Sequence, residues 1–331
     1  MSRAHEIRLS PGKELHLTDA DLWLDARYPK PHAFVSHAHA DHVARHQHIL
    51  CSPVTAHLLQ ARYGIARERL QMVEFHQPIA WKQFLLTLLP AGHIAGSSML
   101  HVIDLNHDTS LLYTGDYKLR TSRSTETATW QKADTLVMES TFGLPRYVLP
   151  SSEQIEEQIL HFLDQALADH ATPILLGYSL GKAQEIAAIL DAHQRPYVNS
   201  AAVAKMTEAC REAGVSLSKP ELADQEIPQG HALIAEPQFL RSKKISHMAQ
   251  PRTAIMTGWA LDPSARFRYG TDGAIPLSDH ADYPDLLRTA ALVEPKKIIT
   301  IHGYTRELAS SLRSQKYQAW SHYGNDQLEL W

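Results

Sequence analysis

Cysteine is scarce in this chain, with two residues, Cys51 and Cys210, among 331. Two cysteines provide no disulfide framework of the kind found in small secreted proteins, so we expect a reducing cytoplasm as the compartment. Both residues lie outside every motif described below. We therefore expect them to be buried, small apolar residues rather than reactive thiols.

Long apolar runs are also missing. No stretch approaches the roughly 18 apolar residues of a membrane helix, and residues 1–6 lack the apolar core of an export signal. We therefore expect no membrane partner. A composition of 44% hydrophobic and 21% charged residues is ordinary for a globular protein, and the length allows one large core or two moderate ones.

An excess of positive charge is absent as well, because the formal net charge is −4. Proteins that coat nucleic acid non-specifically are usually basic. Binding to nucleic acid is still allowed, since the acidic ligands of a metal would add to the negative count and a local basic strip can guide a strand. The candidate strip contains Arg241, Lys243, Lys244 and Arg252, with Phe239 and His247 among them. The alternative is an ordinary solvated surface.

Residues 36 to 42 read Ser-His-Ala-His-Ala-Asp-His, so four of seven side chains can bind a divalent metal. Alternate residues of an extended segment point the same way, so His37 and His39 can share one metal. Asp41 and His42, just past the bend, can face a second. Chance clustering among 21 histidines is the alternative. However, packing hardly explains two His two positions apart that are followed by Asp-His and preceded by the strand-like residues 33–35. Mixed imidazole and carboxylate ligands suit zinc first, and manganese or iron next.

Three apolar runs end in further candidate ligands. The runs are 84–89, 111–113 and 297–301, and they lead to His93, Asp116 and His302. In α/β proteins, the residues of functional sites usually lie at the ends of strands. Gly115 permits the tight turn that aims the Asp116 carboxylate outward. Together with the heptapeptide these residues make five His and two Asp, the ligand set that a two-metal centre requires.

In this order the motifs resemble the metallo-β-lactamase superfamily, through Leu24-Asp25, the heptapeptide, Gly92-His93 and Thr114-Gly115-Asp116. More narrowly, the chain resembles the β-CASP nucleic-acid nucleases, through Glu139-Ser-Thr, Ser179-Leu-Gly-Lys-Ala-Gln-Glu185, Ser278-Asp-His-Ala-Asp282 and Ile301-His-Gly303. Within this group the chain most resembles the bacterial ligase-associated DNA exonucleases, in its compact length and in the sequence of residues 276–283. The resemblance covers nearly the whole chain.

This resemblance implies an α/β fold, namely a metallo-β-lactamase αββα sandwich with an inserted, shortened β-CASP-like α/β domain. We expect the sandwich in residues 1–149 and 258–331, and the insert in residues 150–257. The first part alternates short apolar runs with turns. After residue 150 the pattern becomes helical, with Ser152 as the expected cap, and a buried strand follows over 172–176.

Residue by residue, the resemblance implies roles for the motif side chains. His37, His39 and His93 would hold one metal, Asp41, His42 and His302 the other, and Asp116 would bridge them. Asp25 would orient a ligand imidazole, the alternative being a turn residue. Glu139 would hold His280 protonated so that His280 donates to the departing 3′ oxygen as general acid. The candidate catalytic residues are therefore Asp25, Asp41, Glu139 and His280.

Such a centre predicts phosphodiester hydrolysis. Two metals about 3.5 to 4 Å apart lower the pKa of a shared water and offset charge on the phosphodiester, leaving a 5′-phosphate. The resemblance implies a DNA exonuclease working in repair beside an ATP-dependent ligase, with a DNA ligase and a helicase as candidate partners. An RNA-processing nuclease is the alternative. A lactone or ester hydrolase is the third, for which Glu139 and His280 would have no use.

Contacts to the substrate are less strongly indicated. The helix start after Gly181 can hold a phosphate through its amides, with Ser179 and Lys182 nearby, although it lacks the P-loop spacing. Domain packing is the alternative there. Trp259 can stack a base, or can pack where the chain returns to the first domain.

Overall fold

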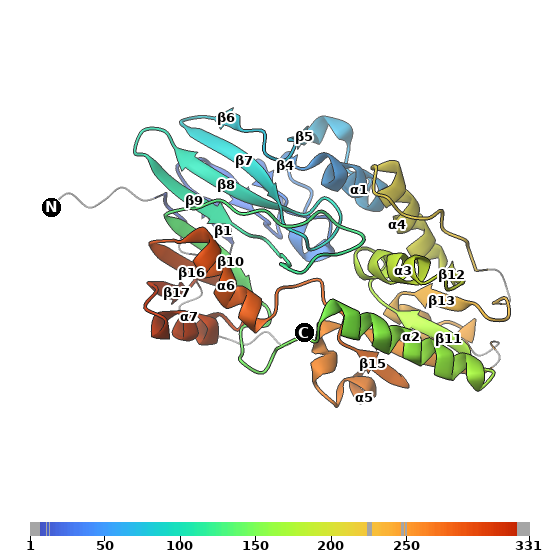
Figure 1. Cartoon of the computed structure of the whole chain (residues 1–331). Coiled ribbons are helices and arrows are strands. Elements are labelled where there is room, and N and C mark those ends of the chain that lie inside the picture. The colour runs from blue at the N-terminus through green and yellow to red at the C-terminus, as the bar shows by residue number, and fades with distance from the viewer. Residues whose placement is uncertain are drawn as a thin grey trace. The chain divides into compact units, whose positions relative to one another are not determined.

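A computed structural model of the chain describes residues 7–10, 12, 14–223, 227–245, 248 and 250–322. Contacts between residues divide the chain into two compact units (Figure 1). The first comprises residues 1–121, 126–147 and 280–331, and the second comprises residues 122–125 and 148–279. The chain thus returns to the first unit at residue 280 rather than at the expected 258. The reason is that β15 (Gly273–Ile275) pairs in parallel with β14 (Pro251–Met256) of the second unit.

The first unit contains two sheets. One is five-stranded, in the order β1 (Leu15–Leu17), β2 (Leu22–Leu24), β3 (His32–Phe34), β4 (His48–Cys51) and β5 (Leu70–Met72). The other is seven-stranded, in the order β17 (Ala319–Ser321), β16 (Lys297–Gly303), β10 (Thr135–Ser140), β9 (Thr109–Tyr113), β8 (Ser98–Asp104), β7 (Phe84–Pro90) and β6 (Ile79–Trp81). In the second of these, β9, β10, β16 and β17 run parallel, so their carboxyl ends lie at one edge.

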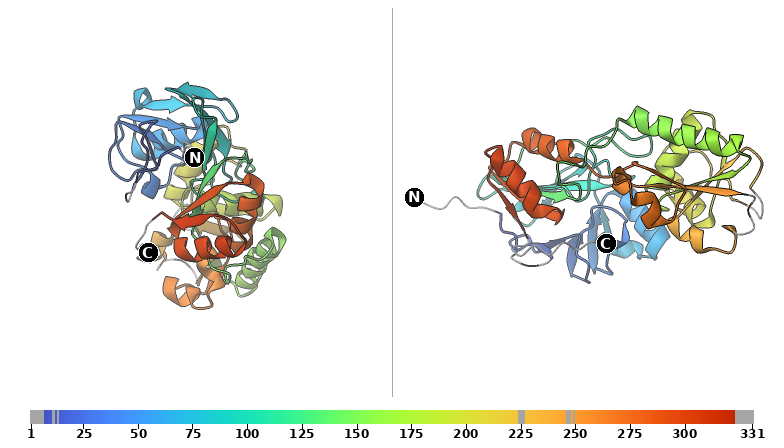
Figure 2. Two further views of the ribbon diagram at one scale, coloured as in Figure 1. Left: turned by 90° about the vertical axis from the view of Figure 1, so that its left-hand side faces the viewer. Right: turned by 90° about the horizontal axis from the view of Figure 1, so that it is seen from below.

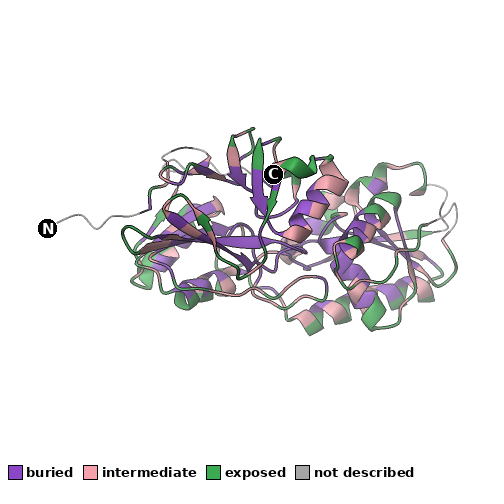
Figure 3. Cartoon of the chain, turned by 90° about the horizontal axis from the view of Figure 1, so that it is seen from above, coloured by how far each residue is buried: buried purple, intermediate pink, exposed green. Residues whose placement is uncertain are grey.

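Apolar side chains fill the space between these two sheets. Leu24, Phe34 and Leu50 of the first sheet share a core with Leu86 and Tyr113 of the second. The alternation of strand side chains sends the neighbouring residues to the outer faces. Burial of this kind contributes roughly 25 cal/mol per Å² of apolar surface, and Figure 3 colours the central strands as buried.

Helices cover the outer faces of both sheets. Helix α1 (Pro53–Tyr63) contacts β5, while α6 (Tyr283–Val293) and α7 (Thr305–Ser314) pack on the seven-stranded sheet (Figure 2). Helix α1 begins where the Ser52 side chain accepts from Thr55 N, and it ends at Gly64, whose φ is +64°. The layers run helix, sheet, sheet, helix, which confirms the expected fold class.

The second unit is built on a parallel sheet of five strands, in the order β12 (Tyr197–Asn199), β13 (Ala232–Ala235), β11 (Thr172–Leu176), β14 and β15. Its helices are α2 (Ser152–Ala168), α3 (Lys182–Ala192), α4 (Ala201–Glu212) and α5 (Ala265–Tyr269). One sheet face packs on α2 and α3, and the other on Phe239 and Tyr269. This is an α/β unit, as predicted.

Short 3-10 helices complete the described elements: η1 (Ala40–His42), η2 (Arg67–Arg69), η3 (Pro237–Arg241) and η5 (Gly258–Leu261). The expected cap of α2 is corrected by one residue. Ser151, not Ser152, accepts from Gln154 N, and the Gln154 side chain accepts from Ser151 N in return.

Both cysteines are free and buried, as expected, and burial raises the pKa of the Cys51 thiol to about 12. Over the part of the chain that the structure describes, no helix is both long enough and apolar enough to cross a membrane.

Candidate metal centre

The heptapeptide leaves the first sheet after β3 and turns through η1, which brings its histidines to the edge of the core. Nε2 of His37 and Nε2 of His93 each lie 3.1 Å from Nδ1 of His39. Ligands in a tetrahedron around a zinc ion, at about 2.0 to 2.1 Å each, lie about 3.3 Å from one another. The three nitrogens therefore fit one divalent metal.

A second group of donors lies beside the first. Asp116 Oδ2 is 3.2 Å from His42 Nε2, 3.7 Å from His37 Nε2 and 3.9 Å from His93 Nε2. The Asp116 carboxylate thus borders both sets of imidazoles, as a bridging ligand must. This donor set also fits a divalent metal, since it mixes imidazole with carboxylate.

Asp41 and His302 lie at the margin of this cluster. Asp41 Oδ2 is 3.6 Å from His42 Nε2, on a side chain that is 62% exposed. The ring centroid of His302 is 6.0 Å from that of His42. Among the described residues neither belongs to a group of three donors whose ligand atoms all lie within 4.8 Å, whereas the other five predicted ligands do.

His302 reaches the cluster through an irregularity in the sheet. β10 and β16 pair in parallel, but the register shifts where Glu139 faces Ile301 and Ser140 faces Gly303. His302 is the extra residue of this bulge, and its φ is +52°, a left-handed value that is uncommon outside glycine. Bulges of this kind re-aim side chains next to active sites.

Asp25 supports two of the ligand histidines. Ser36 N and Oγ donate to its carboxylate at 2.7 and 2.6 Å, and Tyr113 OH donates at 2.7 Å. Ser36 Oγ also lies 2.9 Å from His37 Nδ1, so His37 presents Nε2 to the cluster. His42 Nδ1 lies 3.0 Å from Asp25 Oδ2, at ion-pair distance but outside hydrogen-bond geometry.

We expect Asp25→Asn to weaken metal affinity by about 10- to 100-fold, because the carboxylate that orients the imidazoles is lost. Asparagine tolerates the left-handed backbone of Asp25, whose φ is +46°, so the fold should persist. Competition with a chromogenic chelator measures the affinity, and Ser36→Ala tests the hydroxyl link separately. Unchanged affinity in Asp25→Asn would show that this residue only shapes the turn.

Gly115 allows the chain to pass close to this support. Its φ is +53°, and a Cβ there would come within 2.8 Å of the Ser36 side chain. A side chain at this position is therefore excluded by conformation and by space. The turn directs Asp116 at the end of β9 toward the histidines, as the sequence indicated.

Burial and charge set the protonation states of the cluster. Burial holds the pKa of His37 well below its usual value, and the neighbouring histidines act in the same direction, so the ring is neutral. Burial also lowers the pKa of His302. Burial alone would raise the pKa of Asp116, but His42 and His280 lower it well below its usual range. Burial alone would lower the pKa of His42, but Asp116 and Asp25 raise it well above its usual value, so this ring must lose a proton when a metal binds. Neutral imidazoles beside an ionised carboxylate are the forms that bind metals.

Glu139 and His280 form a pair next to the metal ligands. Glu139 is fully buried, and its two carboxylate oxygens lie 3.1 and 3.0 Å from His280 Nδ1. Tyr117 N and Thr141 Oγ1 also donate to Glu139, at 2.8 and 2.5 Å. Because Glu139 engages Nδ1, proton transfer by His280 would use Nε2, and the ring centroid of His280 is 4.6 Å from that of His93. Sequence analysis did not predict that Tyr113 holds Asp25 or that Tyr117 holds Glu139, because these partners are 88 and 22 positions away in the chain.

The predicted phosphate site at the start of α3 has a different arrangement. Lys182 Nζ lies 2.6 Å from Asp279 Oδ2, with the two side chains 6% and 3% exposed. The ammonium therefore faces a buried carboxylate within the second unit. Ser179 contributes its backbone oxygen, which accepts from Gln184. These contacts favour the packing alternative over phosphate binding.

Removing this ion pair should destabilise the second unit. We expect Lys182→Met to cost about 3 to 5 kcal/mol in the free energy of unfolding, because it leaves the Asp279 charge buried without its ammonium. Urea unfolding measures the change, and Lys205→Met, at an exposed position of α4, is the matched control. A midpoint equal to that of the control would contradict the assignment.

The basic strip lies on the surface of the second unit. Arg241, Lys243 and Lys244 are exposed, whereas Phe239 is buried in the core and Arg252 pairs with Asp169 at 2.6 Å. His247 lies outside the described residues. Trp259 is half-buried in η5 and belongs to the second unit, not to the first. The strip thus belongs to the second unit, whereas the metal cluster belongs to the first.

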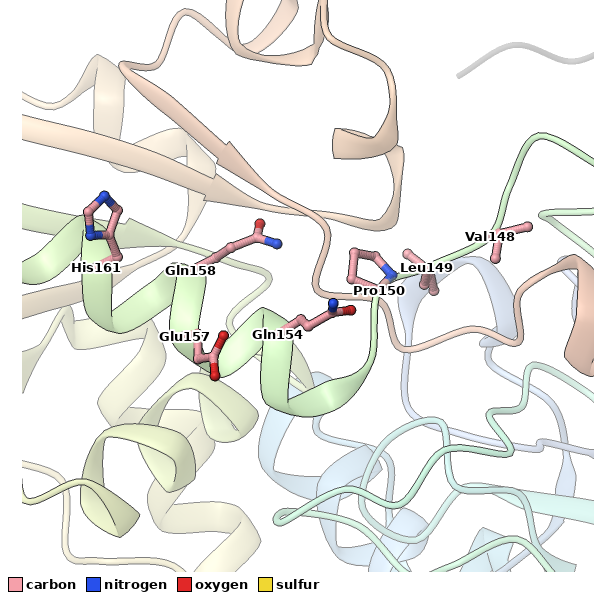
Figure 4. Close-up of a pocket in the computed structure, with 7 residues that line it drawn as sticks. All are labelled: Val148, Leu149, Pro150, Gln154, Glu157, Gln158 and His161. Atoms are coloured by element: carbon pink, nitrogen blue, oxygen red, sulfur yellow. The ribbon is translucent and has the colours of Figure 1, made fainter.

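A hollow in the second unit lies at the start of α2 (Figure 4). Val148, Leu149 and Pro150 form one end, and the polar residues Gln154, Glu157, Gln158 and His161 project from the helix. One carboxylate and one imidazole, with no lysine or arginine in the lining, provide neither a metal set nor a phosphate site. This hollow therefore offers no alternative to the histidine cluster as a metal site.

Comparison with known proteins agrees with this site. Residues 274–321, which include His280 and His302, match the family described as a Zn-dependent metallo-hydrolase RNA specificity domain. The chain is 40% identical to a "Probable DNA ligase" of Opitutus terrae, over 98% of this chain and 32% of that protein. It is 26% identical to the "5′ exonuclease Apollo" of Rattus norvegicus, over 81% of this chain and 50% of that protein.

A further relative is the "Transcription termination factor FttA" of a Lokiarchaeum species, 30% identical over 50% of this chain and 24% of that protein. The chain thus spans half or less of the length of these relatives. The fold, the donor cluster and the matched domain agree with one another and with the resemblance noted in the sequence. The resemblance to the metallo-β-lactamase superfamily, in its β-CASP-like branch, is therefore confirmed.

Proposed function

We propose that this protein is a two-metal-dependent phosphodiesterase that acts as a DNA exonuclease. The observation that carries the proposal is the pairing of two adjacent donor groups with a carboxylate-held histidine. His37, His39 and His93 form one group, and Asp116 borders both that group and His42. An ester hydrolase with the same metals would have no use for the Glu139–His280 pair.

In this proposal His37, His39 and His93 would hold one ion, Asp41, His42 and His302 would hold the other, and Asp116 would serve both. Zinc suits the donors best, with manganese or iron as alternatives. Bound together, two such ions supply hydroxide at neutral pH and offset negative charge on the phosphodiester.

The chain's own residues do the remaining work. Asp25 orients the ring of His37 through Ser36, and its carboxylate lies at ion-pair distance from the ring of His42. Glu139 keeps a proton on His280, and Nε2 of His280 donates a proton to the 3′ oxygen as the bond from phosphorus to that oxygen breaks. The products are a 3′ hydroxyl on one side and a 5′-phosphate on the other.

A role in DNA repair is supported by two relatives. The similarity to a protein named "Probable DNA ligase" covers nearly the whole of this chain, and another relative is named a 5′ exonuclease. We infer that DNA is the substrate, and that an ATP-dependent DNA ligase and a helicase of the same pathway are partners. A cytoplasmic location stays a prediction from the sequence.

An RNA-processing nuclease is the second candidate. The family that matches residues 274–321 is described by RNA specificity, which favours this alternative over any small-molecule substrate. The two candidates share the metal centre and differ in which strand is cut faster.

The test uses chelator-stripped protein, supplied again with zinc or manganese, on matched DNA and RNA strands labelled at the 5′ or the 3′ end. We expect metal-dependent shortening of DNA with RNA spared, and the two labels give the direction. RNA cleavage equal to or faster than DNA cleavage would replace the proposal with the RNA alternative. If neither strand is cut, ester and lactone substrates become the next candidates.

A further inference from the structure

Arg146 is an exposed arginine that lies between two tyrosines of the first unit. Its Nη2 donates to Tyr147 OH at 3.0 Å and to Tyr304 OH at 3.5 Å. Its guanidinium carbon also lies 4.9 Å from the centroid of the Tyr147 ring. The side chain is therefore held by hydroxyls and an aromatic face.

The charge of Arg146 is not offset by a carboxylate among the described residues. Two other arginines of the unit differ, since Arg120 pairs with Asp282 and Arg8 pairs with Asp19, each at 2.6 Å. The recorded contacts of Arg146 use Nη2 alone. Nε and Nη1 remain for an oxyanion, and a guanidinium recognises phosphate through two parallel N–H donors.

The two tyrosines form a fixed support for this guanidinium. Their hydroxyls are 3.0 Å apart and their ring centroids are 5.6 Å apart. Tyr147 O accepts from Tyr283 N, and Tyr304 N donates to Ser140 O, both at 2.9 Å. Each tyrosine is thus anchored through its backbone and in turn holds the Arg146 side chain. Because this side chain is already positioned, it loses little freedom when it binds a ligand.

This support adjoins the proposed catalytic residues. Ser140 directly follows Glu139, and its Oγ donates to the backbone oxygens of Ile301 and His302. Phe142 connects the support to the general acid, since its ring centroid is 5.2 Å from Tyr147 and 6.2 Å from His280. Tyr304 also lies within the segment that matches the RNA specificity domain.

We propose that Arg146, held by Tyr147 and Tyr304, is a substrate-binding residue that grips a backbone phosphate of the nucleic-acid strand beside His280. This deepens the proposed function and rests on it. The ligand is a phosphodiester, whether it comes from DNA or RNA. The strand then crosses the edge where β10 and β16 end, with the bond to be cut facing the donor cluster.

The test compares Arg146→Ala, Arg146→Lys and Tyr304→Phe with Arg8→Ala, an exposed arginine remote from these contacts that also removes one positive charge. Binding to metal-loaded protein is followed by fluorescence anisotropy, using DNA and RNA strands with hydrolysis-resistant phosphorothioate linkages. We expect Arg146→Ala to bind about 10-fold more weakly or worse, because a charge-assisted contact is lost. The slope of affinity against salt should fall by about one phosphate contact.

Further readouts separate a binding role from a merely structural one. Arg146→Lys should restore part of the affinity, Tyr304→Phe should lose several-fold, and KM for the ordinary strand should rise more than kcat falls. Where the wild type binds both strands, equal losses on DNA and RNA identify the shared phosphate as the ligand, and a loss on one of them alone would overturn a backbone contact. If Arg146→Ala matches Arg8→Ala while the wild type binds and cuts strands, this inference fails. If the wild type neither binds nor cuts any strand, the proposed function fails instead.

Discussion

Asp116→Ala is expected to lower strand cleavage by about 10³-fold and to reduce the metal bound. This carboxylate borders both donor groups, at 3.2 Å from His42 Nε2 and 3.7 Å from His37 Nε2. Its loss removes a ligand from each side and leaves neighbouring imidazoles without a counter-charge. Two-metal stabilisation of a phosphodiester is worth several kcal/mol, which sets the size of the effect.

Metal analysis of the purified variant and its kcat on a labelled strand measure both parts of this prediction. Asp116→Asn keeps the shape without the charge and should lose nearly as much. The buried Glu139 is outside the ligand set, so Glu139→Gln is the control that should keep its metal. Full cleavage by Asp116→Ala, with metal still bound, would refute the two-metal account.

The second large effect concerns the general acid. His280→Ala should slow cleavage of a natural strand by about 10²- to 10⁴-fold, the usual contribution of a positioned proton donor. The prediction rests on the contacts of Nδ1 with both Glu139 oxygens, at 3.1 and 3.0 Å, which leave Nε2 to deliver the proton.

A substrate with a nitrophenolate leaving group needs no proton on departure and isolates this role. On such a phosphodiester the variant should lose less than about tenfold. His280 also lies near His93 and Asp116, so its metal content must be measured at the same time. A loss below tenfold on the natural strand, or an equal loss on both substrates, would show that His280 is not the acid.

The predicted ligands were accessible from the sequence because their signals are local. The alternation of His37 and His39 is set by backbone geometry over three residues, and Asp116 follows a short apolar strand and a glycine. The layered fold was expected from the family resemblance that these motifs carry. The sequence placed His302 at a strand end. The bulge that re-aims its side chain depends on the pairing of β16 with β10, so the residues next to His302 in the sequence do not predict it.

Contacts between residues far apart in the chain could not be predicted from the sequence. Tyr113 reaches Asp25 across 88 positions, and the Lys182–Asp279 pair joins positions 97 apart. Such contacts depend on tertiary packing, which local patterns do not record. The same reason explains the boundary at residue 280, because β15 is a three-residue strand whose membership is fixed by its partner β14.

The central claim is that cleavage requires two divalent ions held by these ligands. The most direct test is a zinc titration of chelator-stripped protein that follows bound metal and hydrolysis of a labelled DNA strand in the same samples. The account predicts saturation at about two equivalents, with cleavage appearing only as the second binds. Full cleavage at one equivalent, or cleavage without metal, would contradict it.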